Sequence, residues 1–382
     1  MPTCSCPSSC RLPRLTWIDS MKGISIIWIA FFHCFSVYDT GRYPWPLGLL
    51  QFPDYLAGCA GESITGWLNC FTDGIFAELF QRGPHAVGVF LALSGFSLTL
   101  GLLNSSPSQR GWPAWYGRRL LRLFPLYWMA HLIYLVSPFI KRTEAIDYRF
   151  FLSLLGDRVW PVDTMFFYLN PSWWFFGLLL ELYIVFPLLY RLLQRMGPAV
   201  FLVLCGIVTI LSRYLLLAVF EANGNFIMGA FFGCRLWEFA AGMALAVFFS
   251  KKPMETERLL FSWPMLAAGI LIYGLGGASY RPGFTYAFTD GLIGTGLFII
   301  VAQASRLFER MVIIGPLLPL AGVYSFGIYL LHQPYVLYFG ERLRGQPMTI
   351  FVFAGAGLIM IIAAGAMLIE SGIKKASNKI FS

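Results

Sequence analysis

Long apolar runs dominate this chain and set its predicted architecture. A helix needs about 20 apolar residues to cross the hydrocarbon of a membrane. Ten segments approach or reach that length, at roughly 23–38, 84–103, 123–140, 171–190, 198–217, 229–249, 259–278, 287–304, 317–339 and 349–369. The pattern therefore predicts an all-α polytopic membrane protein with about ten transmembrane helices, gathered in one transmembrane domain over 23–370.

The overall composition excludes the main alternatives. Hydrophobic residues make up 58% of the 382 residues and charged residues 12%, whereas soluble domains average about 45–50% and about 25%. So few charged groups cannot cover a surface that faces water on all sides. A soluble domain, a disordered chain and a coiled coil are all excluded on this ground.

The net charge of +9 is explained by topology. Cytoplasmic loops of membrane proteins carry an excess of Lys and Arg. With both termini inside, 17 of the 28 basic residues fall on the cytoplasmic side and nine outside. The sequence thus predicts cytoplasmic tails at 1–22 and 371–382, with long outer loops at about 39–83 and 141–170. Nucleic acid is not an expected partner.

The eight cysteines do not predict a metal site. Cys4, Cys6 and Cys10 lack partner histidines at ligand spacing. Cys59 and Cys70 share the first outer loop, where they could form a disulfide in an oxidising compartment or remain thiols. The sequence leaves both alternatives open.

Ionisable groups inside a membrane are costly, which makes them candidates for function. In the first predicted helix, Lys22 and His33 are eleven positions apart, so they share a face and His33 lies about 16 Å deeper. Asp19 is on the same side. One interpretation is that this helix face lines a functional site, with a cation at its cytoplasmic end and an imidazole near mid-membrane. The other is a snorkelling Lys and a structural His.

A second basic cluster precedes the third predicted helix. Arg119 and Arg122 are three residues apart, so they face the same way and present planar donors suited to phosphates. Contact with lipid headgroups is the alternative. His131 is nine positions from Arg122, on the opposite face of a straight helix, and is predicted to be structural.

Six further ionisable residues fall in predicted helices, and two of them, Arg213 and Asp290, are noted only as intramembrane charges. Glu181 lies ten residues past Pro171, about 15 Å deep, either as a functional carboxylate or bonded to a neighbouring helix. Arg235 and Glu238 are an i,i+3 pair that can neutralise each other. His332 is expected toward the outer half, in contact with a substrate or in plain packing. Outer aromatic residues fit an interfacial belt: Trp160, Trp173 and Trp174.

These residues occur within a series of short motifs that runs in order along nearly the whole chain. They are Trp17-Ile-Asp19, Lys22-x10-His33, Leu93-Ser94-Gly95-Phe96, Arg119-x-x-Arg122, Trp174-Phe175 through Tyr183 to Phe186-Pro187-Leu188, Arg235-Leu-Trp-Glu238-Phe239, and Tyr324-Ser325-Phe326-Gly327-Ile328-Tyr329-Leu330-Leu331-His332. As an ordered set, they resemble the signatures of membrane-bound acyltransferase family 3. Glu181 departs from the family pattern, in which Gln or a differently placed Glu is common.

The resemblance implies an enzyme of the cell membrane that takes an acyl group, acetyl by family frequency, from cytoplasmic acyl-coenzyme A. The acceptor would be a hydroxyl of a carbohydrate or lipid-linked glycan on the extracytoplasmic side. His33 would act as general base or acyl carrier, with Glu181 as a second catalytic group. The donor would be bound by Lys22, Arg119, Arg122 and Asp19, and the acceptor by His332, Arg235 and Glu238. No metal is expected.

A transporter or flippase is the competing class. Ten helices with buried charges would also serve transport, which commonly uses broken helices in paired halves. No repeat of 20–50 residues is visible in the sequence. The ordered motifs favour the enzyme.

Overall fold

The computed structural model describes residues 15–46, 51–61, 63–105, 111–140, 144–281 and 283–381, with side chains as far as residue 375. These residues form helices, turns and loops and contain no strand. The all-helical prediction is confirmed. Most of the predicted N-terminal tail, with Cys4, Cys6 and Cys10, lies outside the described residues.

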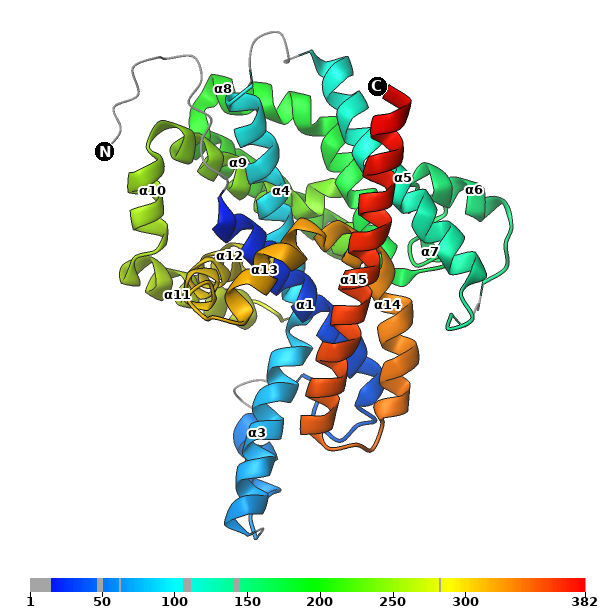
Figure 1. Cartoon of the computed structure of the whole chain (residues 1–382). Coiled ribbons are helices and arrows are strands. Elements are labelled where there is room, and N and C mark those ends of the chain that lie inside the picture. The colour runs from blue at the N-terminus through cyan, green and yellow to red at the C-terminus, as the bar shows by residue number, and fades with distance from the viewer. Residues whose placement is uncertain are drawn as a thin grey trace.

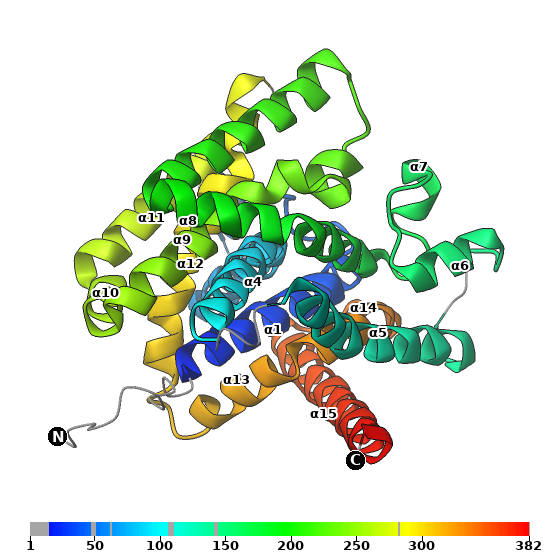
Figure 2. The same cartoon turned by 90° about the horizontal axis from the view of Figure 1, so that it is seen from above.

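The central element is α1 (Thr16–Tyr38), which packs against α4 (Ala86–Leu103), α13 (Ile314–Val323) and α14 (Ser325–Gly340). Figure 2 shows α1 in the middle of the molecule. The helix begins seven residues before the predicted start at residue 23. Its first turns are helical because Trp17 is buried against the rings of Phe96 and Phe261.

Glycines let several of these helices approach backbone to backbone. A side chain at Gly95 would collide with the Phe239 carbonyl of α9 (Leu236–Lys251), and one at Gly322 of α13 would collide with the Asp19 carbonyl of α1. Gly294 of α12 (Thr289–Phe308) meets Gly88 of α4 in the same way. These small residues therefore serve close helix packing.

Several predicted segments are joined or broken in ways that the apolar pattern does not show. Two of them, 171–190 and 198–217, are the two helical parts of α8 (Trp174–Tyr214), which meet at a kink at the non-helical residue Gly197, where φ is 77°. The segment 317–339 is instead split into α13 and α14, which meet at 91°. α10 (Pro253–Leu260) and α11 (Trp263–Ala278) form a second bent pair, at 60°.

Six helices in the described ranges are long and apolar enough to cross a membrane, or up to eight if each bent pair is one span. The protein is therefore a multi-pass membrane protein. All ten predicted segments fall on helices. They include α5 (Trp112–Val136), which carries three arginines and is not one of the six, and α15 (Met348–Phe381). The count of ten and the cytoplasmic placement of both termini stay predictions.

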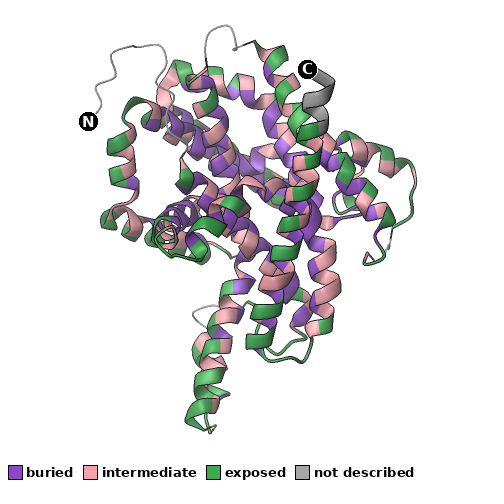
Figure 3. Ribbon diagram, viewed as in Figure 1, coloured by how far each residue is buried: buried purple, intermediate pink, exposed green. Residues whose placement is uncertain are grey.

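Both predicted outer loops contain helices. The first holds α2 (Phe52–Ala57) and α3 (Ile64–Gln81), joined by a disulfide between Cys59 and Cys70. Figure 1 shows α3 extending away from the body, and in Figure 3 its far end is mostly exposed. The second holds α6 (Tyr148–Leu155) and α7 (Val162–Met165).

Short 3-10 and π helices complete the structure, at Gly83–His85, Pro171–Trp173, Leu215–Val219, Phe226–Ala230, Phe232–Arg235, Phe284–Phe288 and Glu341–Leu343. The predicted aromatic belt is wrong for Trp173. Its side chain is 1% exposed, whereas that of Trp160 is 76% exposed. Trp173 is buried because its indole N–H donates to the Leu330 carbonyl of α14 at 2.9 Å.

Candidate functional site

A cavity of about 1600 Å³ lies among α1, α4, α5, α8, α12 and α14. Ligand pockets usually measure about 300–1,000 Å³, so this one has room for the reacting parts of two molecules. Seven of the nine predicted site residues line it: Asp19, Lys22, His33, Arg119, Arg122, Arg235 and His332. Glu181 and Glu238 do not.

The cavity follows α1 from its first turn as far as His33. Asp19 and Lys22 line it near the start of this helix, the loop after α1 contributes Trp45, and the loop that follows α11 contributes Tyr280. The same cavity is therefore lined by the predicted donor-binding residues and by residues of the loops after α1 and α11.

The first region is a basic cluster formed by Lys22, Arg119 and Arg122. Lys22 is 3.7 Å from the Asp19 carboxylate. Glu370, the other acid in this part of the lining, pairs at 3.0 Å with Lys374. Both acids are thus balanced by cations.

The two arginines differ from Lys22 in having no such balance. Among the residues that the structure describes, neither Arg119 nor Arg122 has a carboxylate partner within 4 Å. Arg119 is half-buried, 5.7 Å from the centre of the Trp115 ring. Burial is the main cause that lowers the pKa of the Arg119 guanidinium, and the charge of Arg122 acts in the same direction. An anion bound here would relieve both effects.

Two histidines meet in the middle of the cavity wall. The ring centres of His33 and His332 are 5.3 Å apart. The break between α13 and α14 makes this possible, because α13 packs along one part of α1 and α14 turns to pack along another. The sequence placed His332 toward the outer half, whereas the structure brings it beside His33.

The residues before α8 hold α14 in place around His332. The Asn170 amide and the Trp173 indole donate to the Leu330 carbonyl at 3.2 and 2.9 Å. The Tyr329 hydroxyl donates to the Ser172 carbonyl at 2.8 Å. All of these groups are buried, so they fix the position of the turn of α14 that precedes His332.

Gln333 connects this group of hydrogen bonds to His33. Its side-chain oxygen accepts from the backbone N–H of Ser172, and its amide nitrogen lies 3.3 Å from Nδ1 of His33. A backbone N–H can only donate, so the amide is oriented with its NH₂ group toward His33. In the sequence, the one signal for Gln333 is its place directly after the His332 motif, and spacing alone does not identify it.

Buried charges form a second group beside the cavity, which we call the paired-charge cluster: Arg213, Arg235, Glu238 and Asp290. Arg235 contacts Glu238 at 2.8 Å and Asp290 at 3.6 Å, and Arg213 also pairs with Asp290. The predicted neutralisation of Arg235 by Glu238 is confirmed. Asp290 was recognisable as an intramembrane acid, but only the structure shows that it joins both arginines.

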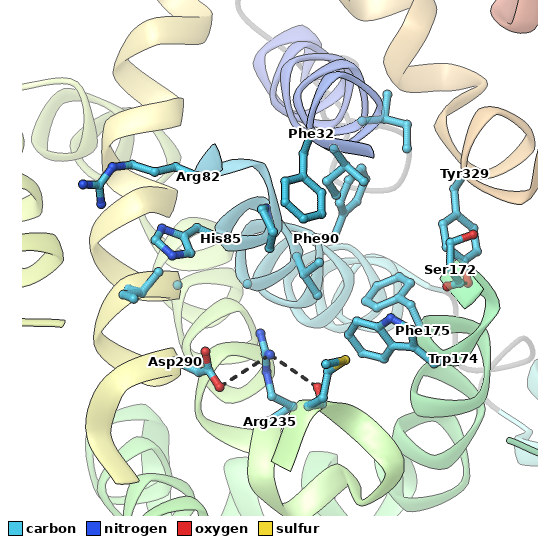
Figure 4. Close-up of a pocket in the computed structure, with 18 of the residues that line it drawn as sticks. Phe32, Arg82, His85, Phe90, Ser172, Trp174, Phe175, Arg235, Asp290 and Tyr329 are labelled. Carbon is cyan, nitrogen blue, oxygen red and sulfur yellow. Dashed lines mark hydrogen bonds and ion pairs between the residues drawn. The ribbon is translucent and has the colours of Figure 1, made fainter. Parts of the chain in front are cut away.

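Figure 4 shows how this cluster faces the cavity. Arg235, Asp290 and His85 lie on one side, and Trp174, Phe175, Ser172 and Tyr329 on the other, with the rings of Phe32 and Phe90 between them. Nδ1 of His85 is 2.7 Å from the Tyr273 hydroxyl. The site therefore combines aromatic faces with fixed polar groups.

Two other predicted residues have structural bonds. Glu181 accepts a hydrogen bond from the Phe232 backbone N–H at 2.8 Å and lies outside the cavity lining. The geometry gives it no contact with His33. His131 is buried, with its ring nitrogens 2.9 Å from the Tyr127 carbonyl and 2.7 Å from the Ser153 hydroxyl. Its predicted structural role is confirmed.

Comparison with known proteins decides the family. A family model described as an acyltransferase domain matches residues 15–369, nearly the whole chain. The chain belongs to membrane-bound acyltransferase family 3. No curated protein and no solved structure matches it. The match to the acyltransferase family includes the basic cluster, both cavity histidines, Gln333 and the paired-charge cluster.

Proposed function

We infer that this acyltransferase moves an acyl group, acetyl in the simplest case, from cytoplasmic acyl-coenzyme A to a hydroxyl of a carbohydrate or lipid-linked glycan on the extracytoplasmic side of the cell membrane. One observation carries the proposal. The same cavity is lined by Arg119 and Arg122, by two histidines, and by residues of the loops that follow α1 and α11. In this proposal, the two substrates approach the imidazoles from opposite sides of the membrane.

The basic cluster supports a phosphate-bearing donor. Arginine forks form charge-assisted hydrogen bonds with phosphate that are shorter and stronger than neutral ones. Arg119 and Arg122 have no carboxylate partner among the described residues, so a phosphate need not displace one. His33 is about 16 Å further along α1 than Lys22, on the same face. In this proposal, the thin pantetheine arm of the coenzyme spans that distance and presents its thioester to the histidines.

The rest of the lining supports a neutral, hydroxyl-rich acceptor. The paired-charge cluster holds two cations and two anions, so it offers donors and acceptors without a net charge. Trp174 and Phe175 add aromatic faces, which suit the apolar face of a sugar ring. A free carboxylate or phosphate would find no excess of positive charge here.

The first test measures donor binding by the purified protein. Each charge-assisted hydrogen bond contributes about 1.5–3 kcal/mol, which corresponds to a change of about 10- to 150-fold in Kd. We expect acetyl-coenzyme A to raise the thermal midpoint of the wild type. In Arg119→Gln and Arg122→Gln, acetyl-coenzyme A should bind more weakly by these factors, so a correspondingly higher concentration of acetyl-coenzyme A is needed for the same shift in thermal midpoint. Arg191→Gln is the matched control, because Arg191 is exposed and does not line the cavity.

The second test measures transfer across a membrane. Proteoliposomes enclose radiolabelled acetyl-coenzyme A, with methyl glycosides outside. If the protein is the proposed enzyme, labelled glycoside should appear outside and free coenzyme A inside, in equal amounts.

Two outcomes would contradict the proposal. In the binding test, thermal protection by acetyl-coenzyme A that is the same in all three arginine variants would contradict the donor site. Movement of unmodified glycoside without release of coenzyme A would indicate a transporter instead.

A further inference from the structure

The hydrogen bonds around His332 determine which of its nitrogens carries the proton. Nδ1 lies 2.8 Å from the Tyr329 carbonyl and 3.2 Å from the Ile328 carbonyl. Carbonyl oxygens only accept, so Nδ1 must be the protonated nitrogen. In the neutral ring, Nε2 then carries a lone pair. Among the described residues, this buried Nε2 has no hydrogen-bond partner.

The bonds of His33 give the opposite result. The Gln333 amide is oriented by Ser172 so that it donates to Nδ1 of His33. Nδ1 is therefore the acceptor, and a neutral His33 carries its proton on Nε2. Two imidazoles whose centres are 5.3 Å apart are thus held in complementary forms, one with an available N–H and one with an available lone pair.

The unpartnered nitrogen of His332 requires an explanation. A buried acceptor without a hydrogen bond is destabilising. The Tyr329 and Ile328 carbonyls satisfy Nδ1 of the same ring but leave Nε2 without a partner among the described residues. His332 also lines the cavity. A ligand hydroxyl that donates to Nε2 would supply the missing bond.

We propose that His332 is the general base of the transfer reaction and that His33 is the hydrogen-bond donor that stabilises the oxyanion. This assignment rests on the proposed function and specifies the chemistry of the same site. It gives to His332 the role of general base, which the family resemblance assigns to His33 as one of two alternatives.

The reaction balances with these two groups. Nε2 of His332 removes the proton of the acceptor hydroxyl as the oxygen attacks the thioester carbonyl carbon. The carbonyl oxygen becomes an oxyanion, which accepts a hydrogen bond from Nε2–H of His33. The tetrahedral intermediate then collapses, forming the ester C=O and breaking the C–S bond. The leaving thiolate takes the proton from His332, which gives free coenzyme A and a neutral imidazole.

One test reads the tautomers directly and does not depend on activity. The chain has only four histidines, so ¹⁵N-histidine NMR of the protein in lipid bilayers resolves them, with single His→Gln variants for assignment. We expect His332 protonated at Nδ1 and His33 at Nε2. The reverse pattern, with His33 protonated at Nδ1, would overturn the assignment.

The second test uses substitutions that imitate one ring nitrogen each. The Gln amide reaches the position of Nε2 and still donates, but it is not a base. His33→Gln should therefore retain at least tenfold more transfer to methyl glycosides than His332→Gln. Loss of the base costs about 10²–10⁴-fold. Loss of an oxyanion donor, as in His33→Asn, costs about 10²–10³-fold.

Hydroxylamine as acceptor separates the two roles, because it attacks thioesters without prior deprotonation. After subtraction of the reaction without enzyme, His332→Asn should keep hydroxylamine-dependent release of coenzyme A within tenfold of wild type, whereas His33→Asn loses it. Thermal protection by acetyl-coenzyme A shows that each variant is folded. Equal losses in both variants with both acceptors would overturn the division of roles. A wild type that releases no coenzyme A with any acceptor would refute the proposed function itself.

Discussion

Replacement of Asp290 by Asn removes one of the two negative charges from the paired-charge cluster. Asp290 contacts both arginines of the cluster, and the Arg213 side chain is completely buried. At 3.6 Å and an effective dielectric constant of about 20, its attraction to Arg235 alone is about 5 kcal/mol. Arg235 retains Glu238 at 2.8 Å, which offsets part of this loss. Arg213 retains a hydrogen bond to the Tyr286 carbonyl and a contact with the Tyr286 ring, 5.2 Å away, but no carboxylate partner among the described residues.

The net effect follows from the behaviour of buried ion pairs. Removal of one partner costs about 3–5 kcal/mol, because the other charge stays buried without compensation. An unfolding entropy of about 2.1 cal/mol/K per residue over 382 residues gives about 0.8 kcal/mol/K. The thermal midpoint of Asp290→Asn in detergent should therefore fall by about 4–6 °C.

The control is an exposed pair of the same chemistry. Lys252 and Glu255 are 2.7 Å apart, with side chains 67% and 69% exposed. Exposed pairs contribute about 0–1 kcal/mol, so Glu255→Gln should lower the midpoint by about 1 °C or less. The double variant with Arg213→Gln should recover part of the loss in Asp290→Asn. A shift for Asp290→Asn no larger than that for Glu255→Gln would refute this reasoning.

Two further predictions concern the packing of α1 against α13 and the disulfide of the first predicted outer loop. Gly322→Ala places a methyl group against the Asp19 carbonyl, so α1 and α13 must separate, and we expect a loss of about 1–3 kcal/mol in thermal stability and weaker protection by acetyl-coenzyme A. Gly357→Ala, at a site with open space outside the cavity lining, should change neither. Cys70→Ser removes the disulfide to Cys59, so limited proteolysis should cut α3 faster than in the wild type under non-reducing conditions, with donor protection unchanged; equal cleavage rates would show that the disulfide does not hold this region together.

The sequence predicts those features that depend on local periodicity. All ten apolar segments fall on helices, because about 20 consecutive apolar residues leave the chain few other stable structures in a membrane. Lys22 and His33 line the same cavity, as the 3.6-residue period of a helix requires for an eleven-residue spacing. Their catalytic and binding roles stay predictions.

Features that depend on tertiary contacts were not accessible in this way. The break at Tyr324 places His332 beside His33, although the apolar pattern runs on without interruption across it. Arg158 falls in the predicted outer loop 141–170, where a cation is expected to face water, yet it is 1% exposed and donates to the Ser153 hydroxyl and to the Tyr168 carbonyl. Charge and hydropathy give the average environment of a residue, whereas burial of a particular side chain depends on partners far away in the chain.

The extent of the cavity has an electrical consequence. A water-filled path along α1 would conduct protons and ions, and each elementary charge that crosses 100 mV dissipates about 2.3 kcal/mol. Under the proposed function, an acyl group must pass without a leak of ions across the membrane. Apolar constrictions block ion flow by excluding water, and the rings of Phe32, Phe90 and Phe175 surround the middle of the cavity. In this proposal the three phenylalanines are also the barrier to ions, so we expect their size to affect ion leakage as well as substrate fit.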